Sequence, residues 1–587
     1  MSTTSTRPAS QASTVISETK TVVQDETSPD FIYGGPFITT QTTSPFLNIA
    51  TPFNTQLQGT FKKSFAYYSL KERLPVILTK VIDYLSRESG KIKSAHSASD
   101  EDIRAFIQYI TKLKNDLVTN KQYDLLTVDT PEAKKWNEYI QNSECQYYFT
   151  NIWIFSECYV YRRLWEGCEL SKTLQNFDYF DEQKEQAFQN SLEPMCMVAD
   201  KLVTMLEESD KDKRKSDFIS LLKISLWSNK CDLSLSLGEQ VTLKDDSSNA
   251  SRKLLDPFQL ILDLKDKVLV DDSGKICDQV ITKAESMAKA IEKEELKSEE
   301  SKTEKTESAE KTEGDAEVEE AEPEPCPAKM TIPKSVMFDI VCDNSGYELF
   351  SDLCLAHYLI AQNIVQKVRF HVKKIPWFVS DVTPRDFKYV IEACAQASYS
   401  VELPPDPKPE PAEGEAPESE PEVAKKVNSE NLKKIGEEWK KYLADGTFVV
   451  MSDDYWTSPK VFADMKKYDF PLYRKLQFAI AVLFKGDLNY RKLLCERNCI
   501  PTLGFEAALQ GFIPAPIIAL RTVKADLICG LPKGKYEQLN KIDEKWMEKG
   551  DYGVIQFCAK AEPLKPSDRP CAEYGDTCTG ERCDLQK

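Results

Sequence analysis

The second half of the chain contains short hydrophobic runs that each end in charged or amide residues. Residues 336–342 end in Asp343 and Asn344, 375–379 in Ser380 and Asp381, 478–484 in Lys485, Gly486 and Asp487, and 516–520 in Arg521, Thr522, Val523 and Lys524. Such runs, alternating with helical patterns, predict parallel strands of an α/β sheet. Ligands of these sheets bind beyond the carboxyl ends of the strands. We therefore expect these acids and bases to face one crevice.

The first half of the chain has a different pattern, in which apolar residues recur at spacings of three and four. This periodicity predicts helices over 70–85, 100–117, 132–139, 150–165 and 185–206. We expect an N-terminal all-helical domain at 31–291 and an α/β domain at 331–561, whose mainly parallel sheet is flanked by helices in a Rossmann-like three-layer core. A chain of 587 residues is too long for one compact core, which agrees with two folded domains.

Low-complexity segments interrupt and flank these domains. Residues 292–330 are rich in Glu, Lys, Ser and Thr, and residues 403–424 alternate Pro, Glu and Ala. Neither segment can bury enough apolar surface to offset the entropy of ordering it. We therefore expect two disordered insertions, the second of them inside the α/β domain. The ends of the chain, 1–30 and 562–587, are predicted to be disordered tails.

The net charge of −18 is concentrated in the two insertions. Residues 291–325 carry a net charge of −10 and residues 401–424 a net charge of −7, so the rest of the chain is nearly neutral. No basic stripe predicts a nucleic-acid partner. The hydrophobic content of 41% supports real hydrophobic cores in the remaining segments.

The cysteines and the length of the apolar runs bear on the compartment. The 17 cysteines are odd in number and form no CxxC pair, which favours free thiols in a reducing compartment. The apolar runs fall short of a membrane-spanning length, and the first residues lack the apolar core of a signal peptide. We expect a soluble intracellular protein in the cytoplasm, with the nucleus as an alternative, and no membrane partner.

The side chains at the first two strand ends suit a metal ion. Asp343, Asn344 and Asp381 offer only oxygen ligands with a combined charge of −2, which favours Mg²⁺ or Mn²⁺ over zinc. The chain has three histidines, and none has a partner at ligand spacing. Each acid taken alone is more often a turn residue, but their joint placement at neighbouring strand ends favours a metal site.

Glu348 has two interpretations that the sequence does not separate. Ser345 and Glu348 match a helix capping box, in which the two residues bond each other's backbone N–H groups. Glu348 also follows the metal candidates closely enough to contact a substrate hydroxyl. Both interpretations stay open at this point.

The later strand ends supply positive charge. Arg521 and Lys524 follow the last run, and Arg491 follows Asp487 after the third run. Fixed cations beside a divalent metal are what a phosphate monoester needs, because charge on the phosphoryl oxygens has to be neutralised while an oxygen nucleophile attacks in line. A lone basic residue at a strand end is usually a surface ion pair. Here the apolar neighbours of Arg521 and Lys524 indicate a buried setting, where an unpaired cation is costly.

Five segments together resemble a known family. They are 226–234 (LWSNKCDLS), 338–353 (FDIVCDNSGYELFSDL), 374–381 (KIPWFVSD), 484–493 (FKGDLNYRKL) and 521–524 (RTVK). The set resembles the damage-control phosphatases, first catalogued as domain of unknown function 89. The subfamily it resembles carries an RTxK motif and is called the acidic residue methyltransferase 1 or sugar phosphate phosphatase group. The resemblance runs from roughly 31 to 560, interrupted by the two insertions.

The resemblance implies roles for individual residues. Asp343, Asn344 and Asp381 would hold the metal, and Asp343, Asp381 and Lys524 would be catalytic. The sugar phosphate would be contacted by these residues together with Glu348, Asp487, Leu488, Asn489, Tyr490 and Arg491, and the motif itself is Arg521, Thr522, Val523 and Lys524. Asn229 and Asp232 would bring the helical domain to the site. The implied substrates are fructose 1-phosphate and fructose 6-phosphate, and the implied metal is Mn²⁺, with Mg²⁺, Co²⁺ or Ni²⁺ as alternatives.

The function predicted from these features is a metal-dependent phosphatase in metabolite damage control, with a small phosphorylated sugar as its partner. Attack by hydroxide and attack by the carboxylate of Asp343 both stay open. The alternative activity is S-adenosylmethionine-dependent O-methylation of glutamate in a protein substrate, which the family is also described as having, although the chain lacks the GxGxG turn of usual methyltransferases. A third interpretation is a non-catalytic module whose acidic insertions recruit a partner.

Overall fold

The structure is a computed structural model that describes residues 46–231, 256–309, 335–403 and 425–563. All of these residues belong to one compact unit, Thr40–Lys587. The predicted tail 1–30 and most of the predicted segments 403–424 and 562–587 lie outside the described residues. The first half of the predicted insertion 292–330 is described and is helical, because helix α12 (Ser273–Ala309) continues as far as Ala309. The division into domains stays a prediction.

A seven-stranded sheet with the order β1-β9-β8-β7-β2-β3-β6 lies at the centre of the unit. Its strands are β1 (Val268–Asp271), β2 (Met337–Val341), β3 (Lys367–His371), β6 (Phe448–Met451), β7 (Val482–Lys485), β8 (Ile517–Thr522) and β9 (Gly553–Cys558). Neighbouring strands pair in parallel except β8 and β9, which are antiparallel. The prediction of a mainly parallel α/β sheet is therefore confirmed. A separate antiparallel ribbon consists of β4 (Ser400–Leu403) and β5 (Lys425–Asn428).

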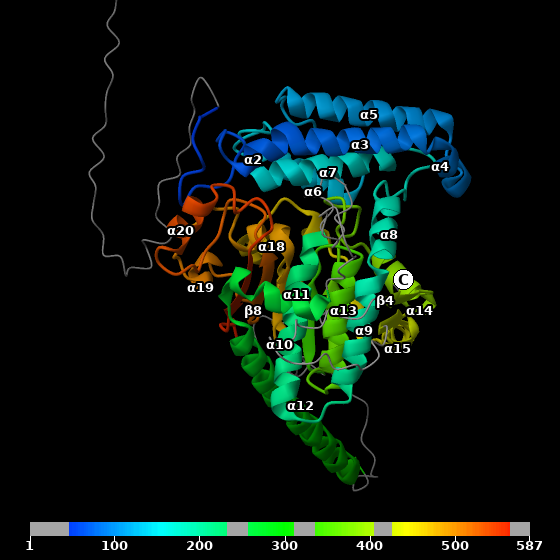
Figure 1. The fold of residues 1–587 in the computed structure, drawn as a ribbon, viewed down its shortest axis with the longest axis vertical. Coiled ribbons are helices and arrows are strands. Elements are labelled where there is room, and N and C mark those ends of the chain that lie inside the picture. Colours follow the sequence, from blue (N-terminus) through cyan, green and yellow to red (C-terminus); the bar gives the residue numbers. More distant parts are fainter. Residues whose placement is uncertain (1–45, 232–255, 310–334, 404–424, 564–587) are drawn as a thin grey trace, which may run out of the picture. The chain divides into compact units, whose positions relative to one another are not determined.

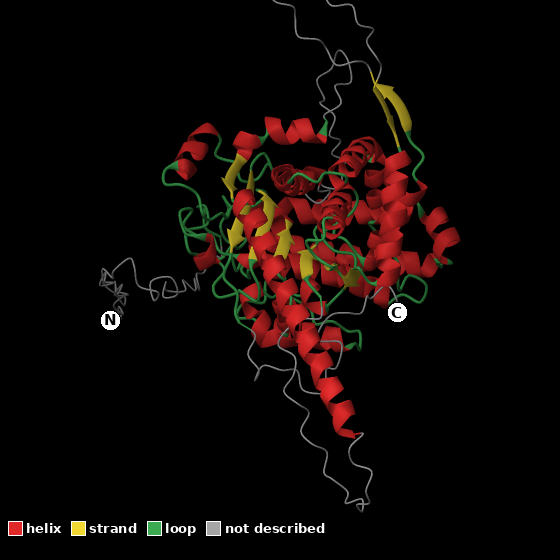
Figure 2. Cartoon of the chain, turned by 90° about the horizontal axis from the view of Figure 1, so that it is seen from below, coloured by secondary structure: helices red, strands yellow, loops and turns green. Residues whose placement is uncertain are grey.

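Alternate residues of the central strands enter two hydrophobic cores, one on each face of the sheet. In β2, Val341 packs into the first core, whereas Phe338 and Ile340 pack into the second. Strands that are buried on both faces are near-continuous hydrophobic runs, which is why these strands are visible in the sequence. Figure 2 shows the strands in a row between helices. The predicted three-layer core is confirmed.

Two sets of helices close these cores. The N-terminal helices α3, α5 and α7 lie side by side over the first core (Figure 1). The helices of the first core include α3 (Leu74–Arg87), α5 (Asp100–Val118), α6 (Pro131–Gln141), α7 (Trp153–Glu169), α17 (Phe470–Gln477) and α18 (Gly486–Leu493). The second core is closed by α9 (Leu192–Leu206), α10 (Lys211–Trp227), α12, α13 (Tyr347–Ala361), α14 (Pro384–Gln396) and α15 (Glu430–Asp445). The shorter helices include α2 (Phe65–Tyr68), the π-helix η1 (Ser69–Arg73), α4 (Ser89–His96), α8 (Asp181–Asn190), α11 (Pro257–Asp263), α16 (Met465–Tyr468), α19 (Phe505–Ala508) and α20 (Lys535–Ile542).

The five predicted helices are all present. In α5 the apolar residues Ile103, Phe106, Ile110 and Leu113 are buried at the expected spacing, and the side chain of Ser99 accepts a hydrogen bond from the backbone of the first turn. The predicted helix at 185–206 is divided into α8 and α9, which follow each other with a break at Ser191.

Two strand assignments differ from the sequence-based expectation. The run 375–379 is not a strand, because it contains Pro376, which has no N–H for a strand ladder. The strand that neighbours β2 is instead β3, earlier in the chain. β1 lies within the region predicted to be all helical and pairs with β9 at the edge of the sheet. It was missed because none of its four residues is fully buried, and Asp271 is exposed.

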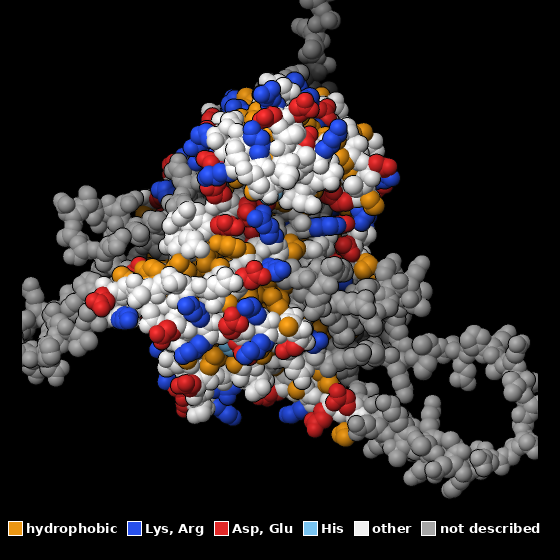
Figure 3. All heavy atoms as spheres, turned by 90° about the vertical axis from the view of Figure 1, so that its right-hand side faces the viewer, with side chains coloured by type: hydrophobic (Ala, Val, Ile, Leu, Met, Phe, Trp, Pro, Cys, Tyr) orange, Lys and Arg blue, Asp and Glu red, His pale blue; other side chains and the backbone are white. Residues whose placement is uncertain are grey.

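Three features of the described residues relate to the compartment expected from the sequence: the helix lengths, the surface charges and the cysteine thiols. No helix among the described residues is long and apolar enough to cross a membrane. On the face drawn in Figure 3, basic and acidic side chains of the described residues are interspersed. Twelve cysteines in the described ranges are free thiols, and eleven of them are buried.

Candidate functional site

The chain segments that follow β2 and β3 form the centre of the candidate site. Asp343 and Asn344 follow β2, and Asp381 lies in the loop after β3, the neighbouring strand. The backbone N–H of Val382 donates to the carbonyl of Asp343 at 2.9 Å, and Asn344 forms an isolated β-bridge with Asp381. The structure therefore brings the two predicted acids together, although through a loop and not at the end of a strand at 375–379.

The loop that carries Asp381 contains two consecutive residues in the left-handed region. Phe378 has a φ of 44° and Val379 a φ of 72°. A positive φ is unfavourable for a β-branched residue and persists where surrounding contacts enforce it. The ring of Phe378 stacks on Tyr161 of α7 with 4.6 Å between centroids. A helix of the N-terminal region thus holds the loop in the conformation that places Asp381.

Two amide side chains bridge the carboxylates of Asp343 and Glu348. The Nδ2 atom of Asn229 donates to Asp343 Oδ2 at 2.8 Å and to Glu348 Oε2 at 2.7 Å. The Nδ2 atom of Asn344 donates to the same two oxygens at 3.0 and 2.7 Å. Thr522 fixes the amide of Asn229 from the other side, because its hydroxyl donates to Asn229 Oδ1 at 2.5 Å. None of these five side chains belongs to a residue more than 5% exposed.

Glu348 does not cap its helix. The N-cap residue of α13 is Gly346, and no side-chain capping bond is present, so the capping-box interpretation is wrong. Instead, Glu348 Oε1 lies 3.0 Å from the ammonium of Lys485, which also lies 2.8 Å from Asp352 Oδ1. Burial raises the pKa of Asp352 to about 6. The buried lysine therefore balances acids on α13 behind the strand ends.

A small pocket opens beside these residues. Its lining comprises three acids, three bases and four apolar side chains: Asp343, Asp381, Asp487, Arg73, Arg491, Lys524, Phe65, Trp153, Phe378 and Leu488. The pocket thus combines acids for a cation, bases for an anion and aromatic faces for a ring.

The two bases of the RTVK segment have different surroundings. Lys524 lines the pocket, and its Nζ donates to the backbone carbonyl of Asn229 at 2.6 Å. Arg521 does not line it. Its guanidinium donates to Asp487 Oδ1 at 2.7 Å and to two backbone carbonyls, and it lies 4.4 Å from the ring centroid of Tyr490. Arg521 therefore holds the loop around Lys524, and of the two bases only Lys524 lines the pocket.

Arg491 lines the pocket while two buried acids hold its guanidinium. Its Nε donates to Glu496 Oε2 at 2.9 Å, and its Nη1 donates to Glu157 Oε2 at 2.6 Å. The guanidinium also lies 3.5 Å from the ring centroid of Trp153. Burial alone would lower the pKa of Arg491, but Glu496 and Glu157 raise it overall. Burial raises the pKa of Glu496 to about 7.

The remaining predicted site residues lie behind the pocket wall or outside the described ranges. Asn489 donates to the backbone carbonyl of Lys485 at 2.8 Å, and the hydroxyl of Tyr490 donates to Gln556 Oε1 at 2.7 Å. Val523 belongs to the first hydrophobic core. Asp232 lies outside the described residues.

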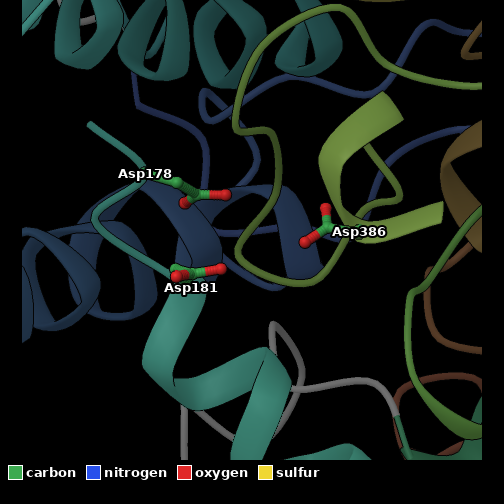
Figure 4. A group of neighbouring side chains, drawn as sticks. All are labelled: Asp178, Asp181 and Asp386. Carbon is green, nitrogen blue, oxygen red and sulfur yellow. The ribbon is translucent and has the colours of Figure 1, made fainter. Parts of the chain in front are cut away.

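A second group of acids lies between α8 and α14. Carboxylate oxygens of Asp178, Asp181 and Asp386 lie within 4.8 Å of one another, a grouping that could hold a divalent cation. Figure 4 shows Asp178 and Asp181 on one chain segment and Asp386 on another, across a shared space. The ammonium of Lys184 lies 2.6 Å from Asp178 Oδ2 and 2.7 Å from Asp386 Oδ2, and Arg385 pairs with Asp181. Two protein cations therefore already offset two of the three carboxylate charges in this group.

The chemistry of Asp343 and Asp381 fits a hard divalent cation better. Both are buried carboxylates on one pocket, and the Lys373 ammonium is 3.3 Å from Asp381 Oδ2, a longer contact than those of Lys184. Oxygen-only donors of this kind suit Mn²⁺ or Mg²⁺. Asn344 turns its amide nitrogen toward Asp343, and its oxygen accepts a hydrogen bond from Ser380 Oγ at 2.6 Å. Its role as a third ligand therefore stays a prediction.

Four lining residues were not predicted as site residues from the sequence: Phe65, Arg73, Trp153 and Phe378. Arg73 and Trp153 occur in amphipathic helical patterns. Such a pattern predicts that a basic residue faces solvent and that an aromatic residue belongs to the hydrophobic core. Phe378 lies inside the segment 374–381, whose left-handed backbone the sequence does not reveal. Of the four, only Phe378 lies inside a segment that the sequence associates with the site.

The chain is an α/β protein with a pocket of acids and bases beyond the carboxyl ends of its parallel strands. Residues 69–539 match the damage-control phosphatase ARMT1-like domain, and the chain belongs to this family. It is similar to proteins named damage-control phosphatase ARMT1. It is 32% identical to that of Danio rerio over 512 residues, covering 85% of this chain and 96% of the relative. The identity is 33% to that of Homo sapiens over 513 residues, covering 85% and 98%, and 34% to that of Mus musculus over 512 residues, covering 84% and 96%. The family expected from the five segments is confirmed.

Proposed function

We propose that this protein is a divalent-metal-dependent phosphatase that hydrolyses sugar phosphates such as fructose 1-phosphate and fructose 6-phosphate. The observation that carries the proposal is the shared pocket of Asp343, Asp381 and Lys524, which come from the turn after β2, the loop after β3 and the loop after β8. Membership of the damage-control phosphatase family supports the reaction class.

Each side chain of the pocket has a task in this reaction. Asp343 and Asp381 hold the cation, and Asn229 keeps the Asp343 carboxylate in place through its 2.8 Å hydrogen bond. The bound metal supplies charge neutralisation and polarisation of a phosphoryl oxygen. Lys524 donates to phosphoryl oxygens from a position fixed by the backbone of Asn229. These donors are oriented before the substrate arrives, so little reorganisation accompanies the reaction.

The rest of the pocket suits a sugar. Asp487 presents a carboxylate that can accept hydrogen bonds from hydroxyl groups, and Phe65, Trp153 and Phe378 present apolar surface to the ring carbons. We propose Mn²⁺ as the metal, with Mg²⁺, Co²⁺ or Ni²⁺ as substitutes, and a site of action in the cytoplasm or nucleus.

No observation favours the methyltransferase alternative. The turn from β2 to α13 contains one glycine, Gly346, where a usual methyltransferase has a glycine-rich turn after its first strand. The acids of the pocket are instead surrounded by fixed cations.

The decisive experiment measures phosphate release from fructose 1-phosphate by metal-stripped protein, with and without Mn²⁺. We expect Mn²⁺-dependent release that is lost in Asp381→Ala and retained in Asp83→Ala, which removes an exposed acid on α3. Absence of release from fructose 1-phosphate and other phosphomonoesters by folded, metal-loaded protein would reject the proposal. Treatment with borohydride during turnover separates the two nucleophiles, because a phosphorylated Asp343 carboxylate is reduced to homoserine and a free carboxylate is not.

A further inference from the structure

We propose that Arg73, in the helical N-terminal region, is a substrate-binding residue whose guanidinium binds the phosphate group of the substrate. This inference rests on the proposed function. Arg73 ends the π-helix η1 and lines the same pocket as Asp343, Asp381 and Lys524.

A single buried carboxylate holds Arg73 next to Arg491. Glu157 is 0% exposed, and its Oε1 atom accepts from Arg73 Nη2 at 2.9 Å while its Oε2 atom accepts from Arg491 Nη1 at 2.6 Å. The hydroxyl of Ser69 also donates to Glu157 Oε1, at 2.8 Å. Both ends of the π-helix therefore bond the same carboxylate, and π-helical turns occur frequently at functional sites.

The two arginines differ in how many protein groups pair with their guanidinium groups. Arg491 has Glu496 to itself, shares Glu157 and lies over Trp153. Among the described residues Arg73 shares Glu157, and its guanidinium carbon lies 5.6 Å from the ring centroid of Phe65. The positive charge available to a ligand is thus greater on Arg73 than on Arg491.

One donor of Arg73 has no partner among the described residues. The Nε atom is buried and has no hydrogen bond to the described residues, and at 6% exposure the residue has little access to water. A buried charged donor without an acceptor is unfavourable. An anion in the pocket supplies that acceptor, and a guanidinium offers the forked donor geometry that matches phosphoryl oxygens. The helical region then completes a phosphate site whose other members follow the strands.

The test uses inorganic phosphate as the probe and the full chain loaded with Mn²⁺. Phosphate affinity is measured by titration calorimetry and by competitive inhibition of fructose 1-phosphate hydrolysis, for the natural protein, Arg73→Gln and Arg73→Lys. We expect Arg73→Gln to weaken phosphate binding and raise KM about 10- to 100-fold, and Arg73→Lys to weaken them about 5- to 10-fold, because lysine keeps the charge and loses the fork. Mn²⁺ affinity is expected to stay unchanged in both variants.

Matched measurements separate the outcomes. Arg87→Gln, an exposed arginine on α3, is the control and should leave phosphate affinity unchanged. If Arg73→Gln does not fold, Arg73→Lys decides, since it retains a cation beside Glu157. Unchanged phosphate affinity in every folded Arg73 variant overturns the inference. Natural protein that binds phosphate through Arg73 but hydrolyses no phosphomonoester would instead overturn the proposed function and leave this inference standing.

Discussion

The backbone of Gly486 lies against the carboxylate of Asp343. A β-carbon at position 486 would lie 1.9 Å from Oδ2 and 2.2 Å from Cγ of Asp343, and the glycine has a φ of +79°. Helix α18 begins at this residue, directly after β7. The end of β7 therefore forms one wall of the space in which the carboxylate sits, and any larger residue displaces it.

Replacement of Gly486 by alanine should disable the site. A residue with a β-carbon in the left-handed region costs about 1–2 kcal/mol, and displacement of a catalytic group by about 1 Å can lower the rate about 100-fold. The control is Gly446→Ala, because Gly446 has nearly the same φ, +78°, and no atom within 4 Å of the added β-carbon. We expect both variants to lose stability in urea, and only Gly486→Ala to lose kcat/KM and Mn²⁺ affinity. Equal activity of the two variants would contradict this account.

The two acidic groups can be separated by direct Mn²⁺ binding. Asp343→Asn should abolish tight binding, whereas Asp178→Asn should leave it unchanged, because Lys184 and Arg385 already pair with the acids between α8 and α14. Asp178→Asn should instead lower the free energy of unfolding by about 1–3 kcal/mol, since it weakens a buried charged hydrogen bond while Asp386 still pairs with Lys184. Electron paramagnetic resonance of added Mn²⁺ gives the affinities. The reverse pattern would place the metal beside Asp178.

The hydroxyl of Thr522 should matter for activity although it does not line the pocket. Thr522→Val keeps the shape of the side chain and removes the hydrogen bond to Asn229 Oδ1. The buried oxygen left without its donor costs about 1–3 kcal/mol, and Asn229 becomes free to turn away from Asp343. We expect lower kcat and weaker Mn²⁺ binding, with near-normal values in Thr522→Ser. Loss of activity in both variants would indicate a packing defect and not the hydrogen bond.

His357 should make the fold sensitive to mild acid. Burial lowers its pKa from 6.5 to about 4, and its Nδ1 accepts a hydrogen bond from Trp439 Nε1 at 3.2 Å. Between these values the unfolded chain binds more protons than the folded one, so this contribution is present above about pH 6.5 and is lost as the pH falls toward 4. His357→Gln should reduce the difference in unfolding free energy between pH 7 and pH 4.5 by up to about 3 kcal/mol. Urea titrations at the two pH values measure it, and an identical difference in both proteins would refute it.

The strands that the sequence predicts are ones in which every residue is buried. β2 and β7 are buried at every position and read as hydrophobic runs. β3 is equally central but contains Arg369 and His371, which pair with Asp339 on β2. The buried ion pair gives β3 two polar positions, so their partner Asp339 has to be known before this strand can be recognised.

The residues that line the pocket could be predicted from the sequence where they directly follow the end of a strand. Asp343 and Lys524 come immediately after or near their strands, so sequence order alone locates them. Arg73 and Trp153 reach the pocket only through tertiary packing of distant helices, and no local pattern marks them. Arg521 shows the opposite case, because its position in a motif suggested contact with the ligand while its donors are used by Asp487 and the backbone.

The pocket draws on side chains from Phe65 to Lys524, with Trp153, Asp343 and Asp381 between them. During synthesis, a nascent chain that has passed Asp381 carries Asp343 and Asp381 but still lacks Asp487, Arg491 and Lys524. Contacts of such long sequence separation form late in folding, because the intervening loops have to close first. Translation therefore has to proceed beyond position 524 before a complete pocket exists, and no shorter N-terminal fragment contains the whole site.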